Sequence, residues 1–271
     1  MSESEYASRF AGIERLYGVE NARRIKQFHI CVIGIGGVGS WVAEAFARSG
    51  VGEITLIDND DIALSNVNRQ IHTLTSTLGQ QKVDAMKQRI HDINPEVMCN
   101  IVDDFITERN YQEYLSHGYD YVVDAIDSIK FKALIISYCK RNKIPVVTTG
   151  GAGGLTDPCK IQVADLSKTH HDPLAAKVRQ RLRQEHGFSK NPQRRFAVEC
   201  VFSSQQQVYP KADGSVSHEK PGIHGVSLDC RFGYGASSLV TASFGLFAAS
   251  RVIHKLLAKK PKEALSSQAA T

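Results

Sequence analysis

The first half of the chain alternates short apolar runs with amphipathic segments. Buried parallel strands are predicted by nearly continuous apolar runs at 28–34, 53–58, 98–102, 119–126 and 144–150. Helices are predicted by apolar residues at helical spacing within 38–50, 82–94 and 129–142. This alternation predicts an α/β fold: a Rossmann-like, doubly wound, mostly parallel sheet with helices on both faces.

The regular alternation of predicted strands and helices ends after the glycine-rich stretch at 150–154. We therefore divide the chain into parts. We expect an N-terminal helical arm (1–27), a Rossmann-like nucleotide-binding domain (28–154), a C-terminal substrate-binding part (155–265) and a short tail (266–271). Within the C-terminal part, residues 160–166 predict a strand, and the polar, turn-rich residues 203–229 predict a long loop or lid.

The apolar segment 235–253 is about long enough to span a bilayer. Its Ser, Thr, Gly and Ala residues favour a tightly packed, buried helix instead. The six cysteines form no Cys-x-x-Cys pair, and no signal peptide precedes them. We therefore expect no structural zinc and a cytoplasmic location.

Positive charge is concentrated in one segment of this weakly basic protein. The chain carries a net charge of +5, and residues 168–195 alone contain eight bases and two acids. Such a run is either a solvated helix face or a surface for a polyanion such as nucleic acid.

A glycine-rich turn follows the first predicted strand and opens the first predicted helix. Its glycines are Gly34, Gly36, Gly37 and Gly39. They permit a tight turn and bring backbone N–H groups close to a phosphate at the helix N-terminus. Asp58, at the end of the second strand, stands where an acid accepts hydrogen bonds from ribose hydroxyls. Alone, this pattern is most typical of NAD binding.

The polar residues that follow favour ATP. The loop "LIDNDDIALSNVNRQ" and the next helix supply Asp60, Asn66, Arg69, Gln70 and Lys82. Basic side chains stabilise the charge that develops on a triphosphate, and carboxylates hold magnesium. Asp127, in "DAIDS", follows a strand at the edge where ligands bind in open α/β sheets. We therefore predict ATP and Mg²⁺ as cofactors, and adenylation rather than hydride transfer.

In combination, these motifs resemble the ubiquitin-activating-like superfamily of ThiF, MoeB and HesA. The likeness also includes "LGQQK" and "INP" (93–95), and it covers roughly residues 9–150. It implies adenine and ribose binding around Gly34–Gly39 and Asp58, and magnesium at Asp127. It implies triphosphate contacts from Asn66, Arg69, Gln70 and Lys82.

The chain departs from the ThiF and MoeB pattern in two places. It lacks their two Cys-x-x-Cys zinc pairs. The position of their N-terminal arginine, which reaches the partner subunit's ATP, falls at Gly12. Arg15 or Arg9 would then take this catalytic role, and the resemblance implies a homodimer.

Four further segments extend the resemblance over nearly the whole chain. They are "RFAGIERLYG", "IQVADLSKT", "DPLAAKVRQRLR" and "FGYGASSLVTASFG". They are similar to the branch of tRNA threonylcarbamoyladenosine dehydratases. This implies an enzyme that adenylates the carboxylate of threonylcarbamoyladenosine in tRNA and promotes its cyclisation, releasing AMP and pyrophosphate. It also implies contact with a cysteine desulfurase or sulfur-acceptor system.

Two other functions fit parts of the pattern. An adenylating enzyme for a ubiquitin-like sulfur-carrier protein would need a reactive cysteine, for which Cys200 and Cys230 are the candidates. However, a free cysteine is more often a small buried hydrophobe, and cyclisation within the substrate needs no enzyme nucleophile. A non-catalytic NAD-binding protein would leave Arg69, Lys82 and Asp127 without a role.

Overall fold

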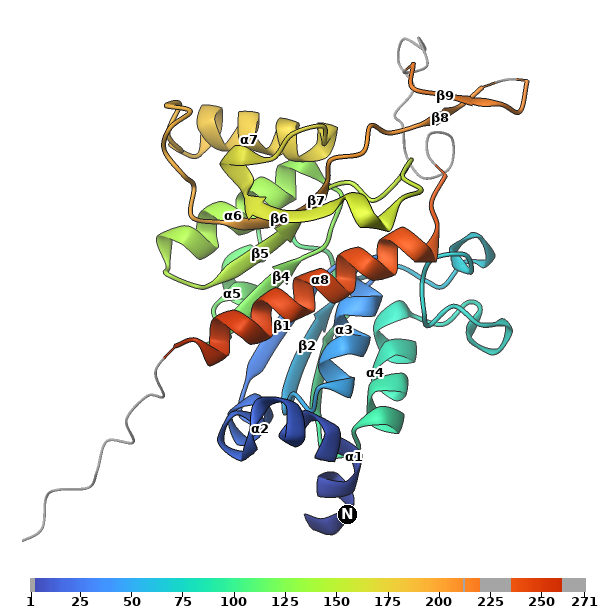
Figure 1. Ribbon diagram of the computed structural model, residues 1–271, viewed down its shortest axis with the longest axis vertical. Coiled ribbons are helices and arrows are strands. Elements are labelled where there is room, and N and C mark those ends of the chain that lie inside the picture. Colours follow the sequence, from blue (N-terminus) through green and yellow to red (C-terminus); the bar gives the residue numbers. More distant parts are fainter. Residues whose placement is uncertain (1–2, 212, 220–234, 260–271) are drawn as a thin grey trace, which may run out of the picture.

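The computed structural model describes residues 3–211, 213–219 and 235–259, and its centre is a seven-stranded sheet (Figure 1). The strand order is β3-β2-β1-β4-β5-β7-β6. The strands are β1 His29–Ile33, β2 Glu53–Ile57, β3 Met98–Val102, β4 Tyr121–Asp124, β5 Val146–Thr149, β6 Ile161–Asp165 and β7 Glu199–Ser203. All neighbours pair in parallel except β6 with β7. The predicted fold class is confirmed.

Helices cover both faces of the sheet. They are α1 Glu3–Tyr17, α2 Val19–Lys26, α3 Gly39–Arg48, α4 Lys82–Ile93, α5 Tyr111–Leu115, α6 Ile129–Arg141, α7 Pro173–Glu185 and α8 Ser238–Leu257. One apolar core joins the sheet to α2, α3, α4 and α8. A second core, on the other face, joins it to α5, α6 and α7. Strands β1, β2, β4, β5 and β7 therefore bury both of their sides, whereas the edge strands β3 and β6 are partly exposed.

The five strands and three helices predicted in the first half agree with the structure to within two residues at each end. The expected N-terminal arm is two helices, because Gly18, with a φ of 83°, ends the first. The sequence interpretation missed the short α5 and also β7, which pairs with β5. Part of the expected loop at 203–229 forms a hairpin of β8 (Tyr209–Pro210) and β9 (Val216–Ser217). Residues 220–234 and the tail lie outside the described residues.

The last helix, α8, crosses one face of the sheet and packs against α3 (Figure 1). Gly245 makes this close packing possible, because a Cβ there would lie 2.7 Å from the carbonyl oxygen of Val38. At its other end, Arg24 of α2 donates hydrogen bonds of 3.0 Å to the carbonyls of Leu256 and Leu257. One side of this helix is buried in the core, whereas other apolar residues of it are exposed, so the expected burial holds for part of the segment. None of the described helices is long and apolar enough to cross a bilayer.

Candidate functional site

The glycine turn between β1 and α3 is closed too tightly for side chains at two of its positions. Gly34 has a φ of 85°, and a Cβ there would lie 2.9 Å from Cγ2 of Ile126. At Gly39, a Cβ would lie 1.7 Å from the carbonyl oxygen of Gly34. The N-terminus of α3 is thus held directly above the end of β1. This is the geometry in which backbone N–H groups and the helix dipole bind a phosphate.

The other two glycines face the loop between β2 and α4. A Cβ at Gly37 would lie 3.3 Å from Cγ of Arg69, and one at Gly36 would lie 3.9 Å from Nε2 of Gln70. The structure therefore brings the glycine turn together with two of the predicted triphosphate contacts. Side chains at these glycines would fill the space that separates the turn from Arg69 and Gln70.

Asp58 lies directly after β2 and connects the turn to Lys82. One carboxylate oxygen accepts a 2.6 Å hydrogen bond from the backbone N–H of Ile35, and the other accepts one of 2.9 Å from that of Asp60. Lys82 Nζ lies 3.7 Å from the same carboxylate and forms an ion pair with Asp60. Burial raises the pKa of Asp58, and the positive charge of Lys82 opposes that rise. Asp58 therefore fixes the turn and the lysine, besides any contact with a ribose.

Arg69 is positioned through its backbone. Its carbonyl oxygen accepts hydrogen bonds from Trp41 Nε1 at 2.9 Å and from Thr241 Oγ1 at 3.3 Å. These partners come from α3 and α8, so both helices hold the loop against the site. The guanidinium is half-buried and donates to the carbonyl of Ser65 at 2.7 Å. The backbone of Arg69, a predicted triphosphate contact, is therefore fixed by two helices.

Several buried polar atoms of this loop have no hydrogen-bond partner in the described part of the chain. They are Gln70 Oε1, both ring nitrogens of His72, and Thr73 Oγ1. Buried polar groups are normally satisfied, so this cluster fits a site whose partners come from a polar ligand or ordered water. Asn66 is also buried, but its Oδ1 accepts from the N–H of Ala63 at 3.1 Å.

His72 was not among the predicted site residues. Burial lowers its pKa to about 4, and the nearby positive charges of Lys82 and Arg89 add to this effect. The imidazole is therefore neutral at neutral pH and presents one donor and one acceptor. Its place two residues after Gln70 was the only signal in the sequence that could have indicated it.

Asp127 lies in the loop after β4 with an exposed side chain. Lys132, a buried residue of α6, holds the backbone of this loop through hydrogen bonds. Its Nζ donates to the carbonyl of Ile126 at 2.9 Å and to the carboxylate of Asp124 at 3.0 Å. Thr148 Oγ1 donates to the second oxygen of that carboxylate at 2.7 Å. The sequence interpretation missed the pairing of Lys132 with Asp124, because Lys132 lies within an ordinary amphipathic helix pattern.

The N-terminal arginines lie at the other edge of the sheet. Arg9 donates a 3.4 Å hydrogen bond to the carbonyl of Ile93, at the end of α4 opposite to Lys82. A helix of 12 residues is about 18 Å long, so Arg9 is remote from the nucleotide site of its own chain. Arg15 is exposed on the same helix, α1. Arg9 could therefore reach such a site only from another subunit.

Cys200 is fully buried in β7. Burial raises the pKa of its thiol well above the usual value, so the reactive thiolate is not formed at neutral pH. Cys230 lies outside the described residues. Among the described cysteines, Cys159 is the exposed one.

The basic segment 168–195 runs from one edge of the sheet to the other. Asp172 caps α7 by accepting a 2.9 Å hydrogen bond from the N–H of Ala175, and it also accepts from the N–H of Gly151, after β5. This helix therefore begins at the edge that carries the nucleotide site. The loop after it leads into the start of β7, which is the opposite edge.

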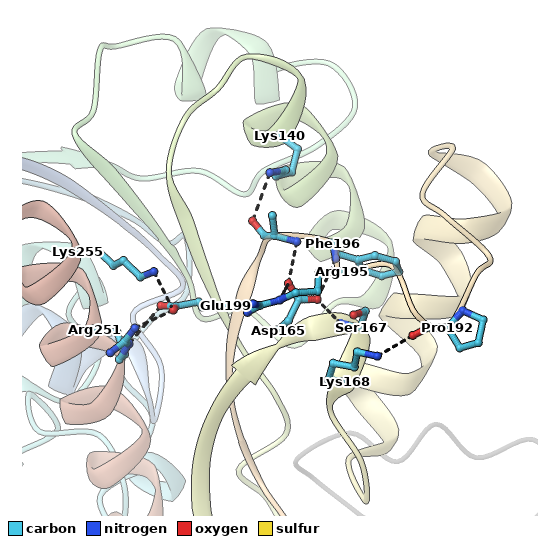
Figure 2. A network of polar contacts seen from close by, with 11 residues as sticks. Lys140, Asp165, Ser167, Lys168, Pro192, Arg195, Phe196, Glu199, Arg251 and Lys255 are labelled. Atoms are coloured by element: carbon cyan, nitrogen blue, oxygen red, sulfur yellow. Dashed lines mark hydrogen bonds and ion pairs between the residues drawn. The ribbon is translucent and has the colours of Figure 1, made fainter. Parts of the chain in front are cut away.

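The loop 189–197 is anchored by the buried carboxylate of Asp165 (Figure 2). This group accepts from the backbone N–H of Phe196 at 2.9 Å and of Ala197 at 2.7 Å. Burial raises the pKa of Asp165, but these hydrogen bonds and those from Ser167 outweigh it and hold the pKa below its usual value. Five bases of the segment remain exposed: Lys168, Lys177, Lys190, Arg194 and Arg195.

The fold and the site together define a Rossmann-like nucleotide-binding protein. The ThiF family model matches residues 7–270, and the chain belongs to the ThiF family, as its motifs predicted. Two similar proteins are named tRNA threonylcarbamoyladenosine dehydratase. That of Haemophilus influenzae is 54% identical over 255 residues, which are 94% of this chain and 95% of the relative. That of Escherichia coli is 51% identical over 259 residues, which are 95% and 97% of the two chains.

The solved structure of the E. coli dehydratase in complex with ATP is also similar to this chain. The TM-score is 0.84 at 49% sequence identity, and the match covers 95% of this chain and 96% of that one.

Proposed function

We propose that this protein is an ATP-dependent dehydratase that acts on threonylcarbamoyladenosine in tRNA. The observation that carries the proposal is the meeting of three segments at one edge of the sheet. The glycine turn after β1, the Arg69–Lys82 loop after β2 and the Asp127 loop after β4 converge there. The glycine turn alone would suit a dinucleotide, whereas the basic residues and the carboxylate of the other two segments suit a triphosphate with its metal ion. The named relatives supply the substrate class.

The reaction has two steps. In the first, an oxygen of the substrate carboxylate attacks the α-phosphorus of ATP, and pyrophosphate leaves. In the second, a group of the same threonylcarbamoyl side chain attacks the activated acyl carbon, a ring closes, and AMP leaves. Arg69 and Lys82 neutralise charge on the departing phosphates. ATP thereby takes up the oxygen that a simple dehydration would release as water.

The donor groups fit Mg²⁺. No group of three or more His, Cys, Asp or Glu side chains that could hold a metal ion occurs within 3–211, 213–219 and 235–259. Mg²⁺ in nucleotide sites is typically held by one or two carboxylates together with phosphates and waters, so exposed Asp127 suffices as the protein ligand. When bound, the ion would offset negative charge on the triphosphate.

Exposed apolar side chains support a homodimer. Leu239, Leu246 and Phe247 are 69%, 50% and 43% exposed along α8, and Leu64 and Val67 are 70% and 59% exposed in the loop after β2. Asn68 of that loop donates to the carbonyl of Ala236 at 2.7 Å, so the two groups lie near each other. A second copy that covers them could supply Arg15 or Arg9. Contact with a sulfur-acceptor system and a cytoplasmic location remain expectations from the sequence.

The proposal is tested by measuring pyrophosphate release with ATP and three potential acceptors. These are tRNA that carries threonylcarbamoyladenosine, the same tRNA without the modification, and a ubiquitin-like sulfur carrier. We expect release only with the modified tRNA, accompanied by loss of one water from the nucleoside in mass spectrometry. Release with the carrier alone would favour the sulfur-carrier alternative, and release with none would favour a binding protein.

Replacement of Cys200 by alanine should leave the rate of pyrophosphate release within about threefold of the parent, because the attacking groups belong to the substrate. The same assay measures this, and alkylation of the folded protein should label Cys159 and spare Cys200. A rate loss of about a thousandfold at unchanged thermal stability would instead indicate a covalent mechanism.

Arg194 and Arg195 should contribute to tRNA binding, because both are exposed on the anchored loop 189–197. In the Arg194→Gln/Arg195→Gln variant we expect weaker tRNA binding and an unchanged KM for ATP, since the loop lies at the edge opposite to the nucleotide site. Each lost phosphate contact should flatten the log–log salt dependence of binding by about 0.7 to 0.9. A salt titration of tRNA binding measures both effects.

The matched control is Arg23→Gln/Arg48→Gln, which removes two exposed arginines from α2 and α3 on the other face of the sheet. It should bind tRNA as the parent does. If both variants had the same salt slope as the parent, the basic segment would be a solvated face.

A further inference from the structure

A cavity of about 470 Å³ lies between the first turns of α7 and the segment that leads into β8. Its lining includes Asp172, Ala176, Arg179, Gln207 and Tyr209. Its volume lies within the range of small-molecule binding sites, and it is broadly open to solvent. None of these residues belongs to the nucleotide site described above, so the cavity is a separate feature of the fold.

The cavity is joined to the nucleotide site by the loop after β5. Asp172 accepts a 3.0 Å hydrogen bond from the N–H of Gly151, and Gln207 Nε2 donates one of 2.9 Å to the carbonyl of Gly153. β5 pairs with β4, whose following loop carries Asp127. Neighbouring strands lie about 4.8 Å apart. The cavity and Asp127 are therefore at adjacent strand ends of the same sheet edge.

Gln207 lines this cavity and has a buried acceptor that is unsatisfied within the described residues. The residue is 8% exposed, and its Nε2 is already used by Gly153. Its Oε1 is buried and has no hydrogen-bond partner among the residues that the structure describes. The reverse orientation of the amide would place Oε1 against the carbonyl oxygen of Gly153, so this assignment is the favoured one. A buried acceptor in this state is costly unless a ligand or a water donates to it.

Arg179 adds hydrogen-bond donors to the same lining. Its guanidinium is half-buried and uses one nitrogen for a hydrogen bond to Thr169 Oγ1. An arginine has five N–H donors in a planar arrangement, so others remain for a ligand. The cavity therefore combines an acceptor from Gln207 with planar donors from Arg179. This pairing is complementary to a group that has an N–H beside a carbonyl.

We propose that this cavity binds the extruded modified base of the tRNA, with its threonylcarbamoyl carboxylate directed toward Asp127. This inference rests on the proposed function. The threonylcarbamoyl group joins adenine through a urea, so Gln207 Oε1 accepts from a urea N–H while Arg179 donates to the urea carbonyl. Unmodified adenosine has no carbonyl at this position, so the cavity selects the modified base. A base must leave its stack to enter, as it does in other enzymes that act on nucleobases.

Ala176→Phe tests the proposal without removing a side-chain hydrogen bond. Ala176 is an exposed residue of α7 that lines the cavity, and a phenyl ring there would occupy part of it. We expect kcat/KM for the modified tRNA to fall about a hundredfold, because the base can no longer be placed for reaction. The KM for ATP and the inhibition constant of unmodified tRNA should not change. The control is Gln180→Phe, one turn further on the same helix and exposed, which should behave as the parent does.

Gln207→Leu tests recognition more directly, with the free nucleosides as probes. Threonylcarbamoyladenosine should bind the parent measurably more tightly than adenosine does in a calorimetric or NMR titration without ATP. In Gln207→Leu this preference should fall about tenfold or more. Parent-like turnover of modified tRNA by Ala176→Phe would overturn the assignment of the cavity while leaving the proposed function intact. If the parent released no pyrophosphate with modified tRNA, the function would fail, and the nucleoside titration would still decide whether the cavity binds the base.

Discussion

Replacement of Asp127 by alanine is expected to lower the rate of pyrophosphate release by about a thousandfold. Asp127 is the exposed carboxylate at the strand ends where Arg69 and Lys82 also lie, so its loss would leave triphosphate charge uncompensated. Stability should not change. The side chain makes no hydrogen bond or ion pair within the described residues, so its removal leaves no buried group unpaired. Pyrophosphate release at several magnesium concentrations, together with thermal unfolding, measures both effects.

The matched control is Asp92→Ala, which removes an exposed carboxylate from the far end of α4. Ten residues of helix separate Asp92 from Lys82, or about 15 Å, so turnover should stay at the parent's level. The assignment of Asp127 would be refuted by an Asp127→Ala protein that turns over normally at limiting magnesium.

Replacement of Lys132 by alanine should lower the free energy of unfolding by about 3–5 kcal/mol. Lys132 and Asp124 are 1% and 0% exposed, and their ion pair measures 3.0 Å. Removal of the lysine would leave a buried carboxylate with no opposite charge. The carbonyl oxygens of Asp124 and Ile126 would also each lose a hydrogen bond. Because this loop leads into Asp127, activity should fall as well. Denaturant unfolding measures the loss of stability.

Lys130 provides the control for this experiment, two residues away on the same helix. Its side chain is 44% exposed, and it forms a 3.0 Å ion pair with the exposed Glu108. Lys130→Ala should cost less than about 1 kcal/mol, because water screens an exposed pair. The double variant Asp124→Asn/Lys132→Met should be more stable than Lys132→Ala, since no unpaired charge is buried. Equal losses at Lys130 and Lys132 would contradict the role assigned to the buried pair.

Local patterns predicted the parts of this protein that depend on neighbours along the chain. The apolar runs located the five strands of the first half, and four of them, all but the edge strand β3, are covered on both faces. The glycine turn could be recognised because Gly34 and Gly39 occupy places that exclude a side chain. Asp58, Lys82 and Asp127 could be selected because parallel strands end at one edge and bring their loops together.

The same reasoning failed where a charged side chain is neutralised by a residue of another helix or strand. Strand β7 was missed because it begins at a charged residue, Glu199. In the structure, this carboxylate is paired with Arg251 and Lys255 of α8 at 2.8 and 3.2 Å (Figure 2). Lys132 was read as part of an ordinary helix, although the fold buries it on Asp124. Pairings of this kind follow from how helices pack on the sheet, and no sequence period records them.

The sequence alone therefore determined the doubly wound fold, the glycine turn and the polar groups at its edge, because backbone geometry and strand burial are local or periodic constraints. Only the tertiary structure decided which of those groups are held in place and by what. In it, Asp58 lies between the glycine turn and Lys82. Arg9 lies at the sheet edge opposite to the nucleotide site, and the basic segment extends along α7 from one sheet edge to the other. The tertiary structure also formed the cavity around Gln207 from segments about 30 residues apart. Such contacts depend on the packing of whole elements, and that packing is set by buried surfaces that no short stretch of sequence contains.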